Sequence, residues 1–243
     1  MAVPLFVRAL QAEFAAVADP EKARSLSWFF KTGKGQYGEG DRFLGIPVPV
    51  QRKIALRYVD LPLKRIEALL KSKIHEHRFA ALEILVAKYE RGAPDTREQV
   101  FAFYLNHTAH INNWDLVDTS APYIVGEHVA HGSREILHRL ASSQDLWERR
   151  IAVVSTLALI RHGEVDETFR ISRKLLADRH DLIHKAVGWM LREAGKVSRE
   201  ALLEFLQDHH SELPRTALRY AIERFGPDER RQFLAGQRLP EGP

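Results

Sequence analysis

The sequence predicts an all-α fold, and three observations support that prediction. Apolar residues recur at helical spacing through nearly every long segment. Residues that favour helix starts stand where helices should begin, as with Asp19 before Pro20. Convincing hairpin signals and alternating strand pairs are lacking in the sequence.

The expected helices follow one another along the chain. They cover roughly Val3 to Val17, Pro20 to Phe30, Val50 to Val59, Pro62 to Leu70, His75 to Tyr89, Thr96 to Asn106, Asn113 to Val129, Ser133 to Ala141, Asp145 to Arg161, Asp166 to Ala177, Asp181 to Gly195, Ser198 to Gln207, Pro214 to Phe225 and Pro227 to Leu234. The stretch Gly33 to Pro49 is rich in glycine and ends with two prolines, so it is expected to be the longest loop.

Composition limits the class of protein. A chain of 243 residues suits one large domain, here taken as residues 1–243. The absence of cysteine excludes disulfides, thiolate nucleophiles and cysteine zinc sites. The first residues do not resemble a signal peptide, and no apolar run is long enough to span a membrane. We therefore expect a soluble monomer in the cytoplasm. A sequence pI of about 9.3 permits a nucleic-acid partner without establishing one.

Similar helix openings recur along the chain and predict a repeat. Taking the residue two before an alanine as the anchor gives Arg78, Arg150, His184 and Arg215. The first gap is 72 residues, and half of it falls on Trp114; the later gaps are 34 and 31. Helix pairs at this period indicate an α-solenoid. Because arginine is rarely buried without a partner, we expect Arg78, Arg150 and Arg215 to face one concave groove.

The stretch Ile111 to Pro122 separates two of these helices. Asn112 or Asn113 can cap the second helix, on which Trp114 and Asp118 lie four residues apart on one face. A tryptophan and a carboxylate on an exposed face can form a reactive site. Alternatively, Trp114 is a core residue and Asp118 an ordinary solvated charge. Asp115 lies on a different face and is expected to matter little.

Several motifs together resemble one family, the AlkD-like DNA alkylation repair proteins, which are HEAT-like alkylpurine DNA glycosylases. The resemblance covers almost the whole chain. The motifs are WDLVD at Trp114 to Asp118, WERRIA at Trp147 to Ala152, KAVGWMLRE at Lys185 to Glu193, the glycine-rich loop from Phe30 to Gly45, and PRTALRYA at Pro214 to Ala221.

The resemblance implies a C-shaped solenoid of about six HEAT-like repeats that holds duplex DNA in a basic concave groove. It also implies hydrolysis of the N-glycosidic bond of cationic N3- or N7-alkylated purines without base flipping, and a location in the bacterial cytoplasm or nucleoid. Carried over by motif, the catalytic residues are Asp118, Trp114, Trp189 and Arg150. The expected DNA-binding residues are Lys31, Lys34, Arg42, Arg78, Lys185, Arg192 and Arg215. No cofactor or metal is expected.

The residues also support this chemistry physically. A purine alkylated at N7 or N3 is already a cationic leaving group, and cleavage leaves positive charge on the sugar. Asp118 can stabilise that charge and orient water. Trp114 and Trp189 offer aromatic faces to it, and Arg150 can hold a phosphate.

Some features depart from the family or suggest other functions. Pro47 and Asn113 stand where relatives carry other residues, which bears on substrate range. Among the twelve histidines, His107/His110 and His128/His131 have ligand-like spacing, but HExxH is absent. Two alternatives to a glycosylase stay open: a non-catalytic solenoid that binds DNA, and a HEAT scaffold that binds a protein.

Overall fold

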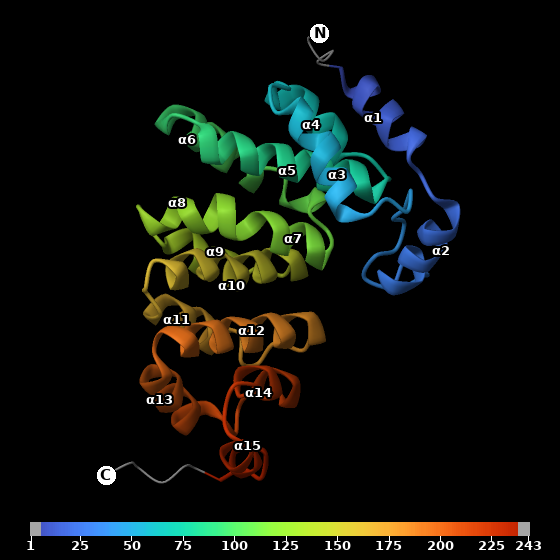
Figure 1. Ribbon diagram of the computed structural model, residues 1–243. Helices are drawn as coiled ribbons and strands as arrows, with labels where there is room; N and C mark the ends of the chain where they lie inside the picture. Colours follow the sequence, from blue (N-terminus) through green and yellow to red (C-terminus); the bar gives the residue numbers. More distant parts are fainter. Residues whose placement is uncertain (1–5, 238–243) are drawn as a thin grey trace. The chain divides into compact units, whose positions relative to one another are not determined.

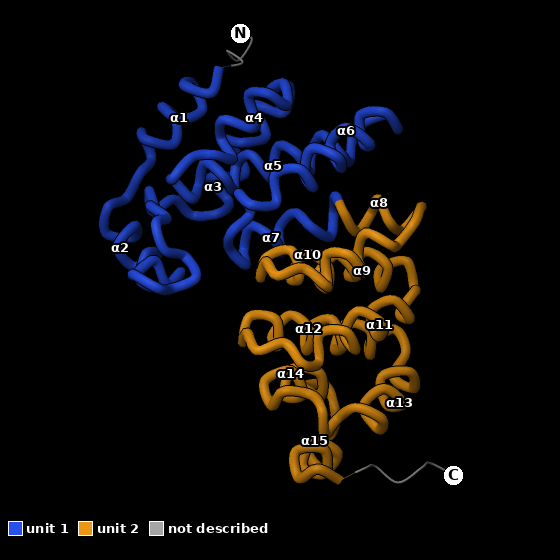
Figure 2. The backbone as a smooth tube through the Cα atoms, turned by 180° about the vertical axis from the view of Figure 1, so that it is seen from behind, with its two compact units in different colours: residues 1–124 blue, residues 125–243 orange. Residues whose placement is uncertain are grey.

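The computed structural model describes residues 6–237, and over that range the chain is helical, as predicted (Figure 1). Within these residues no strand forms; a single parallel bridge joins Arg42 and Ile74. The chain divides into two compact units, residues 1–124 and 125–243 (Figure 2). The first residues of the helix expected from Val3 lie outside the described range.

Unit 1 contains seven α-helices in its described residues. They are α1 (Val7–Ala16), α2 (Pro20–Phe29), α3 (Val48–Ala55), α4 (Leu63–Leu70), α5 (His75–Arg91), α6 (Pro94–Leu105) and α7 (Trp114–Ala121). Asp19 caps α2 as expected, because its Oδ1 accepts hydrogen bonds from the amides of Glu21 and Lys22.

Helix α5 is the central helix of unit 1 and packs against α3, α4, α6 and α7. It is buried on nearly every side, so its polar residues near the N-terminus are also buried: His75, Glu76, His77 and Arg78. A buried polar or charged group is costly unless it is paired. These side chains therefore need partners from neighbouring segments, and most of those partners belong to the functional site.

Unit 2 consists, within the described residues, of helices α8 (Glu127–Ala130), α9 (Glu135–Ala141), α10 (Leu146–Arg161), α11 (Asp166–Lys174), α12 (Asp181–Val197), α13 (Arg199–His209), α14 (Arg215–Ala221) and α15 (Pro227–Leu234). Helix α12 packs between α10 and α14. Helix α9 packs against α10, α11 packs against α10 and α12, and α13 packs against α12. The anchors Arg150, His184 and Arg215 all stand near the N-terminal ends of α10, α12 and α14. This packing agrees with repeated helix pairs in unit 2; a solenoid stays a prediction.

One predicted helix is interrupted. The sequence analysis expected a single helix from Asn113 to Val129, whereas the structure has α7, a π-helical turn at Pro122–Gly126 and then α8. Pro122 has no amide hydrogen, so it cannot donate the hydrogen bond that would continue a regular helix. π-helical turns of this kind often occur at functional sites.

Close packing of α12 on α14 explains one glycine of the GWMLRE motif. A Cβ atom at Gly188 would lie 2.4 Å from the carbonyl oxygen of Ala217 and 2.5 Å from Cβ of Tyr220. Neither backbone nor Cβ atoms can move aside easily, so a larger residue would push the two helices apart. Gly188 thereby allows the close contact between α12 and α14 that sets the backbone position of its neighbour, Trp189.

Candidate functional site

Helix α7 begins at the two residues that the sequence analysis selected. Asn113 is the N-cap, and its Oδ1 accepts a hydrogen bond of 2.9 Å from the amide of Trp114. Trp114 and Asp118 stand one turn apart, and both are half-buried. The alternative, a core tryptophan and an ordinary solvated charge at Asp118, stays open, because neither residue is fully buried or fully exposed. Both side chains keep part of their surface open to solvent.

The indole of Trp114 belongs to a stack of aromatic rings. It stacks on Phe30 with ring centroids 5.2 Å apart and planes at 16°, and Phe29 meets it edge-on at 6.1 Å. Phe30 in turn stacks on Phe43 at 5.1 Å, and Phe43 stacks on His75 at 4.5 Å. One stacked ring and one edge-on ring thus pack against the indole, which orients the tryptophan before any ligand is present.

A chain of paired charges extends from this stack through His75. Nε2 of His75 lies 2.7 Å from Oδ2 of Asp115, and Nδ1 of His75 lies 3.2 Å from Oδ2 of Asp41. The same Asp41 oxygen lies 2.5 Å from Nη2 of Arg78. Two carboxylates alternate with an imidazole and a guanidinium, so each buried charge has a partner of opposite sign when His75 is protonated.

These contacts shift the pKa of two members of the chain. Burial lowers the pKa of His75, but the charge of Asp115 and hydrogen bonds to Asp115 and Asp41 outweigh it and raise the pKa to about 9. Burial raises the pKa of Asp41, yet its hydrogen bond with His75 and the charge of Arg78 bring it below the usual value. His75 is therefore protonated and Asp41 ionised at neutral pH.

The network bears on two expectations. Arg78 is only 4% exposed, and it lines a pocket together with Asp41, Ser72 and Lys73. Its expected contact with DNA stays a prediction. Within unit 1, its Nη2 pairs with Asp41 and its Nη1 donates to the carbonyl oxygen of Ser72, while its buried Nε has no hydrogen-bond partner. Asp115, expected to stand apart from the site, is bound to His75 and directly follows Trp114. Sequence periodicity placed Asp115 on another face correctly, but could not show that this face meets α5.

The glycine-rich loop is fixed to α5 by a buried carboxylate. Glu76 is fully buried, and its oxygens accept hydrogen bonds from the amides of Leu44 at 2.9 Å and Gly45 at 2.8 Å. Gly45 has φ of 82°, and a Cβ there would lie 2.1 Å from the carbonyl oxygen of Asp19. Only glycine fits this position. The loop is thus held firmly where it supplies Asp41 and Phe43 to the site.

Asp118 lies beside a second polar group on α7. Thr119 Oγ1 donates to Oε1 of Glu83 at 3.1 Å and accepts from Nη2 of Arg52 at 3.1 Å. On the buried side, the hydroxyls of Tyr104 and Ser120 are 3.0 Å apart. Burial raises the pKa of Tyr104, although the bond to Ser120 opposes this, and the negative charge of Asp118 raises it further. The hydrogen bonds of Thr119 and Ser120 therefore hold in place the helix that carries the Asp118 carboxylate.

Two of the predicted catalytic residues, Arg150 and Trp189, belong to unit 2. Arg150 is 5% exposed, and its Nη1 donates to the carbonyl oxygen of Leu182 at 2.5 Å. Arg150 is therefore not an open surface arginine, and its expected place on a groove stays a prediction. Its contact joins α10 to the first turn of α12, the helix on which half-buried Trp189 stands. Unit 1 holds Trp114 and Asp118; unit 2 holds Arg150 and Trp189.

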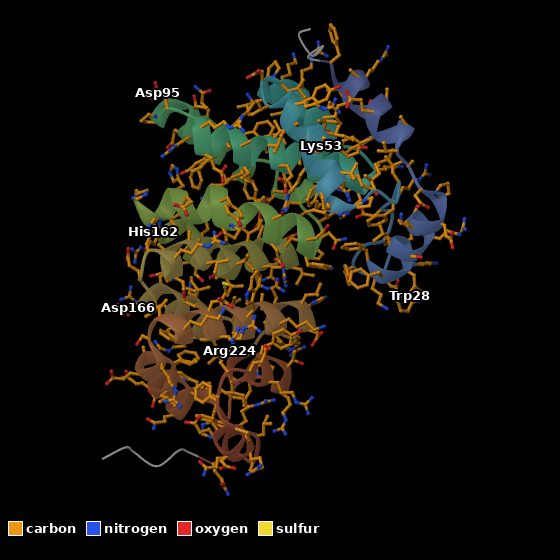
Figure 3. All side chains as sticks on the ribbon, in the orientation of Figure 1. Trp28, Lys53, Asp95, His162, Asp166 and Arg224 are labelled. Carbon is orange, nitrogen blue, oxygen red and sulfur yellow. The ribbon has the colours of Figure 1, made fainter. Side chains whose placement is uncertain are left out.

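The remaining cations predicted to bind DNA differ in how they are held. Lys31, Lys34 and Arg42 are exposed in the glycine-rich loop, and Lys31 lies over the ring of Trp28, 4.8 Å from its centroid. Trp28 itself is 75% exposed at the end of α2 (Figure 3). In unit 2, Lys185 pairs with Asp181, Arg192 pairs with Glu223, and Arg215 donates to the carbonyl oxygen of Leu234.

Sequence reasoning missed Phe29, Phe43, His75 and Asp41. The first three are ring-bearing residues without a motif of their own, and a pairing across 34 residues, as between Asp41 and His75, leaves no periodic signal. The FKTGKGQYGEGDRF stretch did carry a signal, because it is one of the motifs that resemble the family. The motif indicated that the loop is important, but it did not predict which residues the loop contacts.

The histidine pairs with ligand-like spacing do not form metal groups by themselves. In the part of the chain that the structure describes, the one group of histidine and acidic side chains compact enough for a metal ion is Glu127, His131 and His162. It lies in unit 2 and shares no residue with the α7 site. Within the same residues, no helix is both long and apolar enough to cross a membrane.

Comparison with known proteins agrees with this fold. Among solved structures, the chain is similar to a protein described as a predicted DNA alkylation repair enzyme from Enterococcus faecalis. That similarity has a TM-score of 0.68 and 21% sequence identity, and it covers 86% of this chain and 97% of that one. At this identity the likeness defines the fold class. No curated protein matches the sequence significantly.

The sequence itself defines the family. The model of the family described as DNA alkylation repair enzyme matches residues 10–225, which is most of the chain. The protein therefore belongs to the DNA alkylation repair enzyme family, and the resemblance inferred from the motifs is confirmed.

Proposed function

We propose that the protein is a DNA glycosylase that removes cationic N3- or N7-alkylated purines from duplex DNA. The observation that carries the proposal is the pairing of Trp114 and Asp118 on one partly open face of α7, with Trp114 braced by stacked rings. Membership of the DNA alkylation repair enzyme family supports a DNA substrate. The residues present suit a reaction that needs no acid to activate the leaving group.

The proposed reaction begins with heterolysis of the bond between the sugar C1′ and the purine nitrogen. The bonding electron pair leaves with the cationic base, which departs neutral, and the sugar becomes an oxocarbenium ion. Asp118 stabilises this cation by its charge and orients a water molecule toward C1′. The water oxygen bonds to C1′ and its proton passes to the carboxylate. The products are a free alkylpurine and an abasic site.

Aromatic faces have a defined part in this mechanism. The indole of Trp114 presents its negative π-face to a cationic sugar, and such attraction strengthens as charge develops. The stack of Phe30 and Phe43 holds the indole in place, so little reorganisation accompanies the reaction. Trp189 is proposed to act on the substrate from unit 2, on the strength of its motif.

Buried groups are proposed to position the reacting ones. His75 and Asp115 join α5 to the first turn of α7, at the residue that follows Trp114. Arg150 joins α10 to α12 and so supports the helix of Trp189. We assign both contacts to positioning, because the groups involved are mostly shielded from a substrate. The exposed cations Lys31, Lys34 and Arg42 are proposed to contact the DNA backbone.

Family resemblance also suggests that the modified base stays stacked in the duplex. If no pocket encloses the base, the size of the alkyl group is not limited by pocket walls. We therefore propose that N7 adducts much larger than methyl are also released. Rejection of every larger adduct by a protein that releases 7-methylguanine would point to a closed pocket.

Mass spectrometry of bases released from methylated duplex DNA tests the proposed activity. Release of 7-methylguanine or 3-methyladenine by the pure protein is the expected result. If the protein binds such DNA and releases no base, it is a non-catalytic DNA-binding member of the family. If it does not bind DNA either, the function as a protein-binding scaffold becomes the better account.

A further inference from the structure

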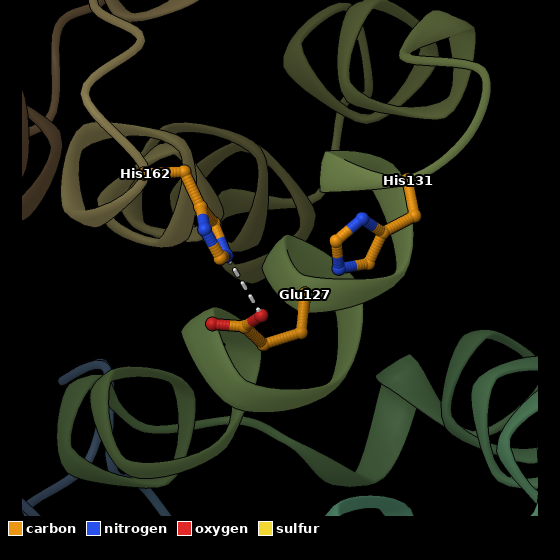
Figure 4. A group of neighbouring side chains, drawn as sticks. All are labelled: Glu127, His131 and His162. Atoms are coloured by element: carbon orange, nitrogen blue, oxygen red, sulfur yellow. Dashed lines mark hydrogen bonds and ion pairs between the residues drawn. The ribbon is translucent and has the colours of Figure 1, made fainter.

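Two histidines and a glutamate that are not among the proposed catalytic residues meet on unit 2. Glu127 is the first residue of α8, and His131 is the C-cap of the same helix, one turn further on. His162 is the C-cap of α10. Figure 4 shows both imidazoles turned toward the Glu127 carboxylate. Sequence spacing paired His131 with His128, whereas the fold brings it to a residue 31 positions later.

The spacing of the ligand atoms suits a small metal ion. Nε2 of His162 lies 3.1 Å from Oε2 of Glu127, and one ligand atom from each of the three residues lies within 4.8 Å of the others. Tetrahedral zinc with bonds of about 2.1 Å places its ligands about 3.4 Å apart. One pair is thus already close to that separation, and a modest side-chain rotation brings in the third.

The chemistry of the set points to a first-row transition metal. Two imidazoles and one carboxylate are a known zinc ligand set, which leaves a fourth position for water. Magnesium and calcium prefer oxygen ligands throughout, so they are poor competitors for two imidazoles. His131 and His162 also stand at helix C-termini, where the partial negative charge of the carbonyl groups favours a cation.

The surroundings allow a metal to enter. The side chain of His162 is 43% exposed and that of Glu127 is 32% exposed, so an ion reaches them from solvent without rearrangement of the backbone. The nearby Glu164 carboxylate is already paired with Arg134. The three side chains therefore stand as a separate group with two neutral donors and one negative charge when the imidazoles are unprotonated.

We propose that Glu127, His131 and His162 form a site for a divalent transition metal, Zn²⁺ in particular, which clips α8 to the C-terminal end of α10. The site is distinct from the α7 residues, so the proposal holds whether or not the protein is a glycosylase. A metal that binds the folded protein and not the unfolded chain stabilises the fold. Bound Zn²⁺ accordingly raises the temperature at which unit 2 unfolds.

Calorimetric titration of the full chain with ZnCl₂ tests the proposal, with millimolar Mg²⁺ present throughout. Wild type is expected to bind one equivalent of Zn²⁺. His131→Asn and His162→Asn each remove a ligand and should weaken binding by roughly tenfold or more. His128→Asn is the matched control, because it changes a histidine of the same helix that is outside the group.

Two further readouts keep the test decisive. Glu127→Gln retains a hydrogen-bond acceptor for His162 but loses the charged ligand, so it should weaken Zn²⁺ binding even if a histidine variant folds poorly. Circular dichroism should show the same helix content in all variants without metal, and Zn²⁺ should raise the melting temperature of wild type and His128→Asn only. Absence of Zn²⁺ binding to wild type, or equal affinity in His162→Asn, overturns the proposal; weaker binding in His128→Asn overturns the assigned ligand set.

Discussion

The imidazole of His75 contacts the carboxylate of Asp115, with Nε2 and Oδ2 2.7 Å apart, and this contact ties the start of α5 to the start of α7. Both side chains are largely shielded from solvent. Oδ1 of Asp115 also accepts from the amide of Leu116 at 2.9 Å. Because Asp115 directly follows Trp114, the contact fixes the backbone that carries the proposed catalytic indole.

Replacing Asp115 with asparagine should therefore impair both stability and activity. The variant keeps an oxygen that accepts from His75 but loses the charge that favours the imidazolium. We expect a loss of about 2 kcal/mol in the free energy of unfolding, the usual range for a hydrogen bond to a charged group. Urea denaturation followed by circular dichroism measures it, and single-turnover excision should fall because Trp114 is less well fixed.

Asp145→Asn provides a control for charge loss at a helix start. Asp145 caps α10 through the amides of Trp147 and Glu148, so its replacement should cost little, since asparagine also caps helices well. A stability of Asp115→Asn equal to that of the control would mean that the contact with His75 contributes nothing measurable.

The raised pKa of His75 predicts how stability depends on pH. A histidine whose pKa is higher in the folded state stabilises the protein fully below its unfolded value of 6.5, and this contribution is lost as pH rises through about 9. The shift corresponds to at most about 3 kcal/mol. Asp41 has a lowered pKa and titrates well below this range. His77, whose pKa is lowered to about 4, adds stability as pH rises through its unfolded value of 6.5, and this contribution is the same in wild type and in a His75 variant.

Thermal melts of wild type and His75→Gln between pH 6.5 and 9.5 measure this effect. Wild type should lose stability across that range more steeply than His75→Gln, which has no imidazole to deprotonate. Parallel curves for the two proteins would show that His75 does not gain its proton on folding.

Glu76→Gln should loosen the glycine-rich loop. The amide that replaces one carboxylate oxygen is a donor, and it would face the donating amides of Leu44 and Gly45. Leaving such buried donors unsatisfied costs about 2 kcal/mol. Limited proteolysis should cut faster within residues 33–47 in this variant. Glu98→Gln on α6 serves as a control, and equal cleavage rates in both variants would mean that Glu76 does not hold the loop.

The helices were predictable because each local signal agreed with the packing. Asp19 and Pro20 set the start of α2, and periodic apolar residues set most other helices to within a few residues. The break at Pro122–Gly126 was missed because the hydrophobic pattern continues through it, and a proline alone does not say whether a helix kinks or ends. The hydrophobic periodicity of a segment predicts that it is a helix, but it does not predict which other helices it packs against.

The candidate site was predictable only in part, for a related reason. Trp114 and Asp118 were found because they lie four residues apart, and helical geometry alone places them on one face. Burial of Arg78 was not predicted, because it depends on Asp41, a residue 37 positions earlier in a loop. The rule that arginines avoid burial holds for unpaired ones, and the sequence did not show the pairing.

Binding to DNA should depend steeply on salt. Each phosphate neutralised by a lysine or arginine contributes about −0.9 to the slope of log affinity against log salt. Lys34→Ala, in the exposed loop, should make the slope shallower by about that amount. Lys196→Ala is the control, because this exposed lysine is engaged by Glu193 at 2.6 Å. A flat salt dependence in wild type, or strong preference for one undamaged sequence, would contradict phosphate-dominated binding.

Asp118→Asn, assayed by single-turnover release of 7-methylguanine and by binding to the same duplex, tests the central claim most directly. Asparagine keeps the size of aspartate and removes its charge. Asp118 repels the anionic backbone before reaction and attracts the sugar only as it becomes cationic, so its loss should act on the transition state. We expect excision to fall by roughly 10²–10³, with DNA affinity nearly unchanged. Excision by Asp118→Asn at the wild-type rate would contradict the assignment of Asp118 as the catalytic carboxylate.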